Sequence, residues 1–243
     1  MSIYTIVLLI VIFGLSLHLF FYWLFGSSGT WVKKEHQQLD HFLPAYDFFE
    51  WHSVAIQAKP EKVYEAIRQF DVNKSKVSKF LLALRSVFQV FKSKKNRGDT
   101  ESTADNQTSN FQLFKSKNNS GNIESTTDNQ ISKIMFILDD VENQEVVLGF
   151  IGMFWHIKPT TVQLSSPAEF VEFDKPGYCK AAWNLYIESN NEDTVTLSTE
   201  TRILCLGSGA KALFLLYWSI IKPYSGFIRI DMLKIIKHEA EST

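Results

Sequence analysis

The chain has 243 residues, of which 45% are hydrophobic, and its formal net charge is −1. This composition is typical of a globular protein and excludes a global polyanion- or polycation-binding character, so we expect no nucleic acid among its partners. Its two cysteines and six scattered histidines lack the spacing of a metal site, so neither a metal nor another cofactor is predicted.

The chain begins with a long uncharged stretch. Residues 3–25 contain no Asp, Glu, Lys or Arg, and a helix of these 23 residues, at about 1.5 Å per residue, is roughly 34 Å long. This length is enough to cross a hydrocarbon core of roughly 30 Å. A cleaved signal peptide would have a basic start and a shorter apolar run. We therefore predict a single transmembrane helix that anchors residues 1–25 in a membrane.

The charges around this stretch predict its orientation. Lys33 and Lys34 follow it, and no basic residue precedes it. By the positive-inside rule, this asymmetry places the C-terminal domain in the cytoplasm. Residues 26–51 combine a Gly/Ser hinge with a polar-aromatic stretch, and we interpret them as a juxtamembrane linker.

A strand and two helices are predicted next. Residues 52–58 (HSVAIQA) alternate as a half-buried strand does. Pro60 opens a helix over residues 60–70 that has apolar residues at helical spacing. A second amphipathic helix is predicted over about 76–91.

An internal duplication follows, in which residues 86–108 align without gaps to residues 109–131 and 15 of the 23 positions are identical. Beyond each FQxF the repeated unit is almost entirely polar, so it cannot bury enough apolar surface to offset its ordering entropy. We expect a disordered surface loop at about 92–133. An alternative is that its aromatic and lysine residues form a membrane-surface patch.

From residue 134 to residue 205 strands dominate, and the last two flank the polar turn SNNED as a hairpin. Matching their apolar faces gives three opposed pairs: Cys179 with Cys205, Trp183 with Thr201, and Leu185 with Thr199. In a reducing cytoplasm the two cysteines are expected to be buried thiols. The opposite face carries polar residues that we expect to be solvated, with an ion pair between the last two: Lys180, Asn184, Glu188, Glu200 and Arg202.

A long C-terminal helix is predicted to begin at Ser208, which is a good N-cap residue. One apolar stripe runs along it: Phe214, Trp218, Ile221, Ile228, Met232 and Ile235. Pro223 lies inside this pattern, and because proline cannot donate the helical hydrogen bond, we expect a kink or a break there.

The order of elements and several motifs resemble a known superfamily. HSVAIQAKPEKVYEAI resembles the opening of the SRPBCC (START-like, polyketide cyclase-like) helix-grip proteins. The segments AEFVEFDKPGYCKAAWNLYIE, LSTETRI and YWSIIKPYSGFIRIDMLKIIKHEAE are similar to those of a bacterial branch without an assigned function. The resemblance covers residues 52–241 except the duplicated loop. It implies an α+β helix-grip domain, in which a bent antiparallel sheet wraps around the long C-terminal helix.

The same resemblance implies a cavity between the sheet and that helix. Thr199 and Thr201 interrupt the apolar face of their strand, and a cavity would let a ligand or water satisfy their hydroxyls. The alternative is structural, since a threonine hydroxyl can also bond to a nearby backbone carbonyl. The candidate ligand-binding residues are Trp183, Leu185, Thr199, Thr201, Phe214, Trp218 and Ile221; no catalytic residue is assigned.

We therefore expect a binding or carrier domain for a hydrophobic small molecule or lipid, associated with the membrane through residues 3–25. An alternative is an enzyme of the cyclase/dehydratase kind, which would need at least two polar side chains converging in the cavity. A further alternative is a ligand-free adaptor that acts through the outer face or the duplicated loop. The oligomeric state is left open.

Overall fold

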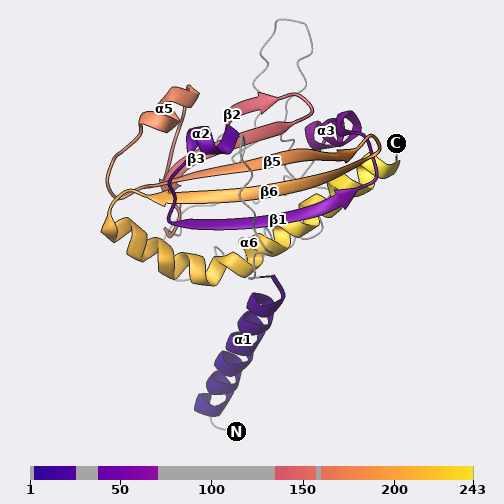
Figure 1. The fold of residues 1–243 in the computed structure, drawn as a ribbon. Helices are drawn as coiled ribbons and strands as arrows, with labels where there is room; N and C mark the ends of the chain where they lie inside the picture. Colours follow the sequence, from indigo (N-terminus) through magenta and orange to yellow (C-terminus); the bar gives the residue numbers. More distant parts are fainter. Residues whose placement is uncertain (1–2, 26–37, 71–134, 157–159, 243) are drawn as a thin grey trace, which may run out of the picture.

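The computed structural model describes residues 3–25, 38–70, 135–156 and 160–242. Figure 1 shows a curved sheet with a long helix across one side of it and a separate N-terminal helix. The helices are α1 (Ile3–Phe25), α2 (Gln38–Phe42), α3 (Pro60–Arg68), α5 (Pro167–Glu172) and α6 (Ser208–Ser242). The strands are β1 (Phe48–Ile56), β2 (Phe136–Val141), β3 (Glu145–Met153), β4 (Thr160–Val162), β5 (Cys179–Asn191) and β6 (Thr194–Cys205).

The sheet is antiparallel in all its pairings. Its order is β1-β6-β5-β3-β2, and β4 pairs with β3. Cys179 pairs with Cys205 and Trp183 with Thr201, as predicted. An α+β domain with a bent antiparallel sheet and a long C-terminal helix is therefore confirmed, and this architecture fits a helix-grip fold.

The predicted linker contains structured residues. Strand β1 begins at Phe48, four residues before the predicted start, and α2 precedes it. Leu39 and Leu43 are buried against the sheet. Residues 38–51 are thus part of the folded domain.

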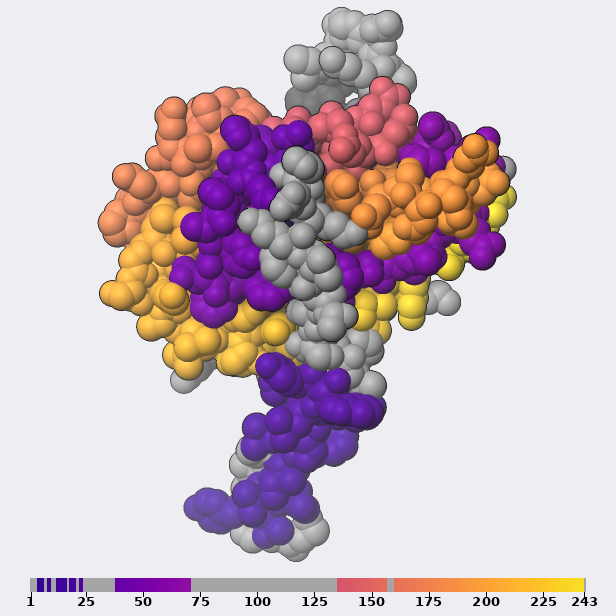
Figure 2. All heavy atoms as spheres, in the orientation of Figure 1, coloured from indigo at the N-terminus to yellow at the C-terminus, as the bar shows by residue number. Residues whose placement is uncertain are grey.

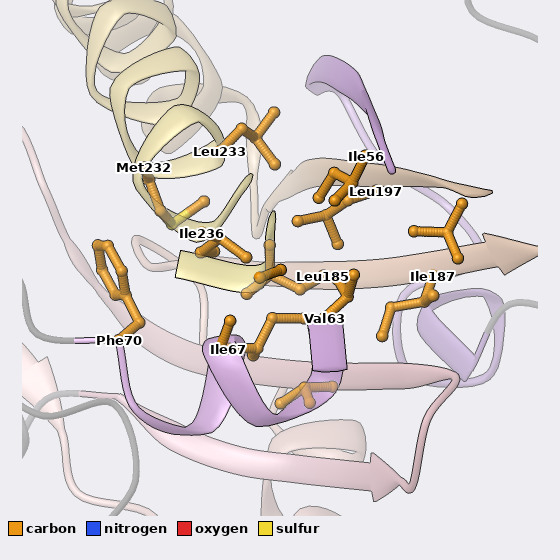
Figure 3. Packing of buried hydrophobic residues seen from close by; sticks show 14 of the residues in the cluster. Ile56, Val63, Ile67, Phe70, Leu185, Ile187, Leu197, Met232, Leu233 and Ile236 are labelled. Carbon is orange, nitrogen blue, oxygen red and sulfur yellow. The ribbon is translucent and has the colours of Figure 1, made fainter. Parts of the chain in front are cut away.

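Two apolar clusters fill the ends of the space between the sheet and α6. The first combines α3, the second half of α6 and one end of the strands (Figure 3), including Val63, Ile67, Leu185, Leu197, Met232 and Ile236. The second lies under the first turns of α6 and includes Cys179, Ala181, Ile203, Cys205 and Phe214. We call the side of the sheet that faces α6 the inner face, and the opposite side the outer face.

Helix α6 is one continuous helix of 35 residues that contains Pro223. Of the predicted kink or break at Pro223, the break is therefore absent, and Figure 1 shows α6 curving along the sheet. This curvature is consistent with the loss of one backbone donor at proline, which bends a helix that packing holds together.

Helix α1 covers the residues of the predicted anchor. Within the described parts of the chain, however, no helix is both long enough and apolar enough to cross a membrane, so the transmembrane assignment is not supported. Near its C-terminal end α1 meets α6, where the rings of His18 and Tyr224 lie 6.2 Å apart. The predicted helix at about 76–91 and the duplicated loop fall outside the described residues.

Candidate functional site

The register of the sheet brings polar residues together at the centre of the inner face. Glu50 of β1 pairs with Thr201 of β6, which in turn pairs with Trp183 of β5. The next inward position of β1 is His52, opposite Thr199. Side chains alternate between the two faces of a sheet, so Glu50 and His52 share a face with both threonines. We call Glu50, His52, Trp183, Thr199, Thr201, Ser225 and Arg229 the polar centre.

Glu50 is the acid of the polar centre, and only 1% of its surface is exposed. Its Oε1 lies 3.1 Å from Nε2 of His52, and its Oε2 accepts a hydrogen bond of 2.5 Å from the Ser225 hydroxyl. Strand β1 and helix α6 therefore meet through a carboxylate whose two oxygens are both engaged. Such engagement is what a buried carboxylate needs in order to offset its desolvation.

Arg229 lies one turn after Ser225 on α6, and its guanidinium stacks 4.1 Å from the centre of the Trp183 ring. Burial lowers the pKa of Arg229 to about 10, and the negative charge of Glu50 opposes this shift. No described residue accepts a hydrogen bond from the guanidinium, although it carries five N–H donors. A planar, stacked guanidinium with free donors is well suited to bind an oxygen of another molecule.

The two threonines have different environments. Thr199 Oγ1 accepts a hydrogen bond of 2.5 Å from Trp183 Nε1 and donates one of 2.8 Å to the Asn184 carbonyl. Thr201 is only 6% exposed, and its hydroxyl has no hydrogen-bond partner among the described residues. The structural alternative thus accounts for Thr199, whereas Thr201 keeps a hydroxyl that a ligand or water would satisfy.

The structure brings only part of the predicted ligand-binding set to the polar centre. Trp183, Thr199 and Thr201 lie there, but Leu185 is fully buried in the first apolar cluster. Phe214 and Trp218 belong to the second cluster, where their rings stack. Ile221 is half-buried on α6. A binding role for these residues remains a prediction.

Glu50, His52, Ser225 and Arg229 were missed by the sequence analysis, although two signals point to them. Glu50 and His52 continue the inward alternation of β1 toward its start. Ser225 lies seven residues after Trp218 and seven before Met232, so it is the polar member of an otherwise apolar stripe. Arg229 follows it at the i+4 spacing that places two residues on the same helix face.

The outer face is not solvated as predicted. Four of its five polar residues are buried: Lys180, Asn184, Glu200 and Arg202. The expected Glu200–Arg202 pair forms at 2.6 Å, and Arg202 also pairs with Asp40 at 2.6 Å. The prediction of a solvated face was wrong because residues 38–47, assigned to the linker, and helix α5 lie over this face; the Lys180 ammonium donates a hydrogen bond of 2.8 Å to the Val171 carbonyl of α5.

Glu145 anchors the same covering segment. Its carboxylate accepts hydrogen bonds from the Asn184 side chain at 2.7 Å and from the backbone N–H of Gln38 at 2.6 Å. Burial raises the pKa of Glu145 above its ordinary value, and these hydrogen bonds oppose the shift. The acid therefore holds the first turn of α2 against the sheet, where a negative charge also complements the helix N-terminus.

Cys179 and Cys205 are buried free thiols whose sulfur atoms are 2.8 Å apart. The hydrogen bond to Cys205, together with burial, raises the pKa of Cys179, so this thiol stays protonated. In the described part of the chain, no group of three or more His, Cys, Asp or Glu residues is placed to hold a metal ion.

Comparison with known proteins adds little to this description. No protein-family model and no curated protein matches the chain. Among solved structures the chain is similar to the Zhui aromatase/cyclase from Streptomyces sp. R1128, at 10% identity over 80% of this chain and 93% of that chain. The TM-score of 0.26 is too low to support an argument, so the fold assignment rests on the strand order and on α6.

Proposed function

We propose that the protein is a ligand-binding helix-grip domain of the SRPBCC type. It holds a hydrophobic small molecule or lipid between the inner face of the sheet and α6. The supporting observation is the polar centre, which lies between two apolar clusters and has donors on Thr201 and Arg229 that no described residue uses. An apolar surrounding with a few polar groups that orient the ligand is the usual composition of a small-molecule site.

Organic extraction of the purified full-length protein, followed by mass spectrometry, tests this proposal. We expect a hydrophobic compound in stoichiometric amounts from the wild type and much less from the Thr201→Val, Arg229→Met double variant. Thr196→Val is the matched control, because Thr196 lies on the other side of the same strand, where it bonds to Asn190. Equal extracts from all three proteins, or no compound from the wild type, would contradict the proposal.

The second candidate function is catalysis of the cyclase/dehydratase kind at the same site. The pair of Glu50 and His52 favours it, because a histidine held by a buried carboxylate is a common general acid or base. If His52 transfers protons in a reaction, the organic extract of the His52→Gln variant should contain the unreacted substrate, whereas the extract of the wild type should contain the product. Identical compounds in the two extracts would leave only the binding function.

Association with a membrane through α1, with the C-terminal domain in the cytoplasm, is part of the same proposal. Among the side chains of α1 that the structure describes, eleven large apolar ones are exposed, from Tyr4 to Trp23. A contiguous apolar surface of this kind marks a place of contact with lipid or protein. The adaptor hypothesis has less support, because the outer-face charges that it would use are mostly buried.

A further inference from the structure

The outward side of the first half of α6 is also apolar. Leu213, Leu216 and Ile220 are 48%, 67% and 58% exposed. Their spacing of i, i+3 and i+7 places them in one row on the helix surface. The row lies opposite Phe214, which is buried on the inner side. This part of α6 therefore has an apolar inner side that packs on the sheet and an apolar outer side that no described element covers.

This row and the exposed surface of α1 belong to the same region of the protein. Figure 2 shows α1 in indigo projecting from the body on the side where α6 is visible in gold. The contact of His18 with Tyr224 joins α1 to the middle of α6. The exposed apolar residues of α1 extend over roughly 200° of its circumference, at about 100° per residue, which is far wider than the single stripe that a protein groove covers.

The charged residues that α1 and the first part of α6 themselves contribute to this region are all basic. Between residues 208 and 230 the sequence of α6 contains no Asp or Glu, and α1 contains no charged residue. Of the three basic residues in this part of α6, Arg229 lies on the inner side over Trp183, which leaves Lys211 and Lys222 for the outward side. Lys211 is largely exposed, although its ammonium pairs with Asp47 at 2.6 Å. Lysines beside an apolar helix surface complement the anionic headgroups of a bilayer. A second protein would have to match both a wide apolar surface and a basic rim.

From these observations we infer that the outward side of α6, formed by Leu213, Leu216 and Ile220, lies in the interfacial region of a lipid bilayer next to α1. The inference rests on the proposed membrane association and adds the placement of the domain. Helix α6 then separates the polar centre from the lipid, since its inner side carries Ser225 and Arg229. A hydrophobic ligand would have a short path along α6 between the membrane and the site.

A fluorescent label on the full-length protein tests this placement. Leu216→Cys carries an environment-sensitive fluorophore, and Glu192→Cys in the exposed β5–β6 turn carries the same label as the control. The native cysteines are buried and need not be replaced. With vesicles of phosphatidylcholine and phosphatidylglycerol, we expect the emission at residue 216 to rise severalfold, to shift to the blue and to be quenched by nitroxide-labelled lipid. The emission at residue 192 should not change.

Each outcome has a distinct meaning. If the protein floats with the vesicles while the label at residue 216 behaves like the one at residue 192, the placement of α6 is wrong and the association through α1 stands. If the protein does not float, both fail. If the label at residue 216 is already in apolar surroundings without vesicles, and the protein is a dimer, a second copy of the chain covers the row and the inference is overturned.

Discussion

The guanidinium of Arg229 lies over the indole ring of Trp183, with its Cζ 4.1 Å from the ring centre. The indole in turn donates its N–H to Thr199, so the position of the arginine is set by a side chain that is itself fixed to the sheet. A cation over an aromatic face contributes about 0.5–2 kcal/mol, depending on desolvation. This stacking leaves the edge of the guanidinium available to an oxygen of another molecule.

Arg229→Met is expected to separate binding from stability. The ligand-free protein loses the cation–π contact but no hydrogen bond to a described residue, so its free energy of unfolding should change by no more than about 2 kcal/mol. A hydrogen bond from a charged donor contributes roughly 1.5–3 kcal/mol, so retention of the bound compound should fall by roughly tenfold to a hundredfold. Urea unfolding and quantified organic extracts measure the two effects. Arg229→Lys, which keeps the charge but not the planar fork, should bind with intermediate strength.

The two threonines should respond differently to valine. Thr199→Val leaves the Trp183 N–H and the Asn184 carbonyl without their partner, which should cost about 1–3 kcal/mol of stability. Thr201→Val removes a buried hydroxyl without a described partner, so it should be neutral or slightly stabilising in the ligand-free protein. Urea denaturation of both variants measures the difference. Equal destabilisation would show that the Thr201 hydroxyl is satisfied in the protein alone.

Much of this fold follows from local patterns in the sequence. The register that places Trp183 opposite Thr201 follows from matching the apolar faces of two strands around a polar turn. Helices α3 and α6 follow from Pro60, Ser208 and apolar residues at helical spacing. These elements are predictable because each one is amphipathic by itself, so its buried side is visible before its partner is known.

The polar centre and the covering segment are harder to predict because they depend on tertiary contacts. Phe48 and Phe49 are both aromatic, so the start of β1 shows no alternation of apolar and polar residues. The sequence pattern therefore does not reveal that Glu50 faces inward. Helix α2 has only five residues, too few for a period, and its position depends on Glu145 from a distant strand. Ser225 and Arg229 become significant only when α6 lies across β1 and β5.

Breaking the buried ion pairs of the outer face should be costly. Arg202 is 1% exposed and binds Glu200, Asp40 and the Leu43 carbonyl, so Arg202→Met leaves buried acceptors and a buried negative charge. Loss of one partner of a buried pair typically costs about 3–5 kcal/mol. The control is Lys237→Met, which removes only a partly exposed pair with Glu241 in α6 and one bond to the Ala55 carbonyl. A thermal unfolding scan should show a much larger fall in Tm for Arg202→Met than for the control.

Glu145 predicts a specific dependence of stability on pH. Its ordinary pKa is 4.5, and burial raises the pKa in the folded protein, with a smaller contribution from the charge of Asp139. The folded state therefore binds the proton of the Glu145 carboxyl group more tightly than the unfolded state does. As a result, the free energy of unfolding falls as the pH rises from the pKa of Glu145 in the unfolded chain to its higher pKa in the folded protein. The Glu145→Gln variant has no titratable group at this position. The difference in unfolding free energy between Glu145→Gln and the wild type should grow in favour of the variant as the pH rises above about 4.5. Urea unfolding at a series of pH values measures it, and a difference that stays constant across the series would show that burial does not raise this pKa.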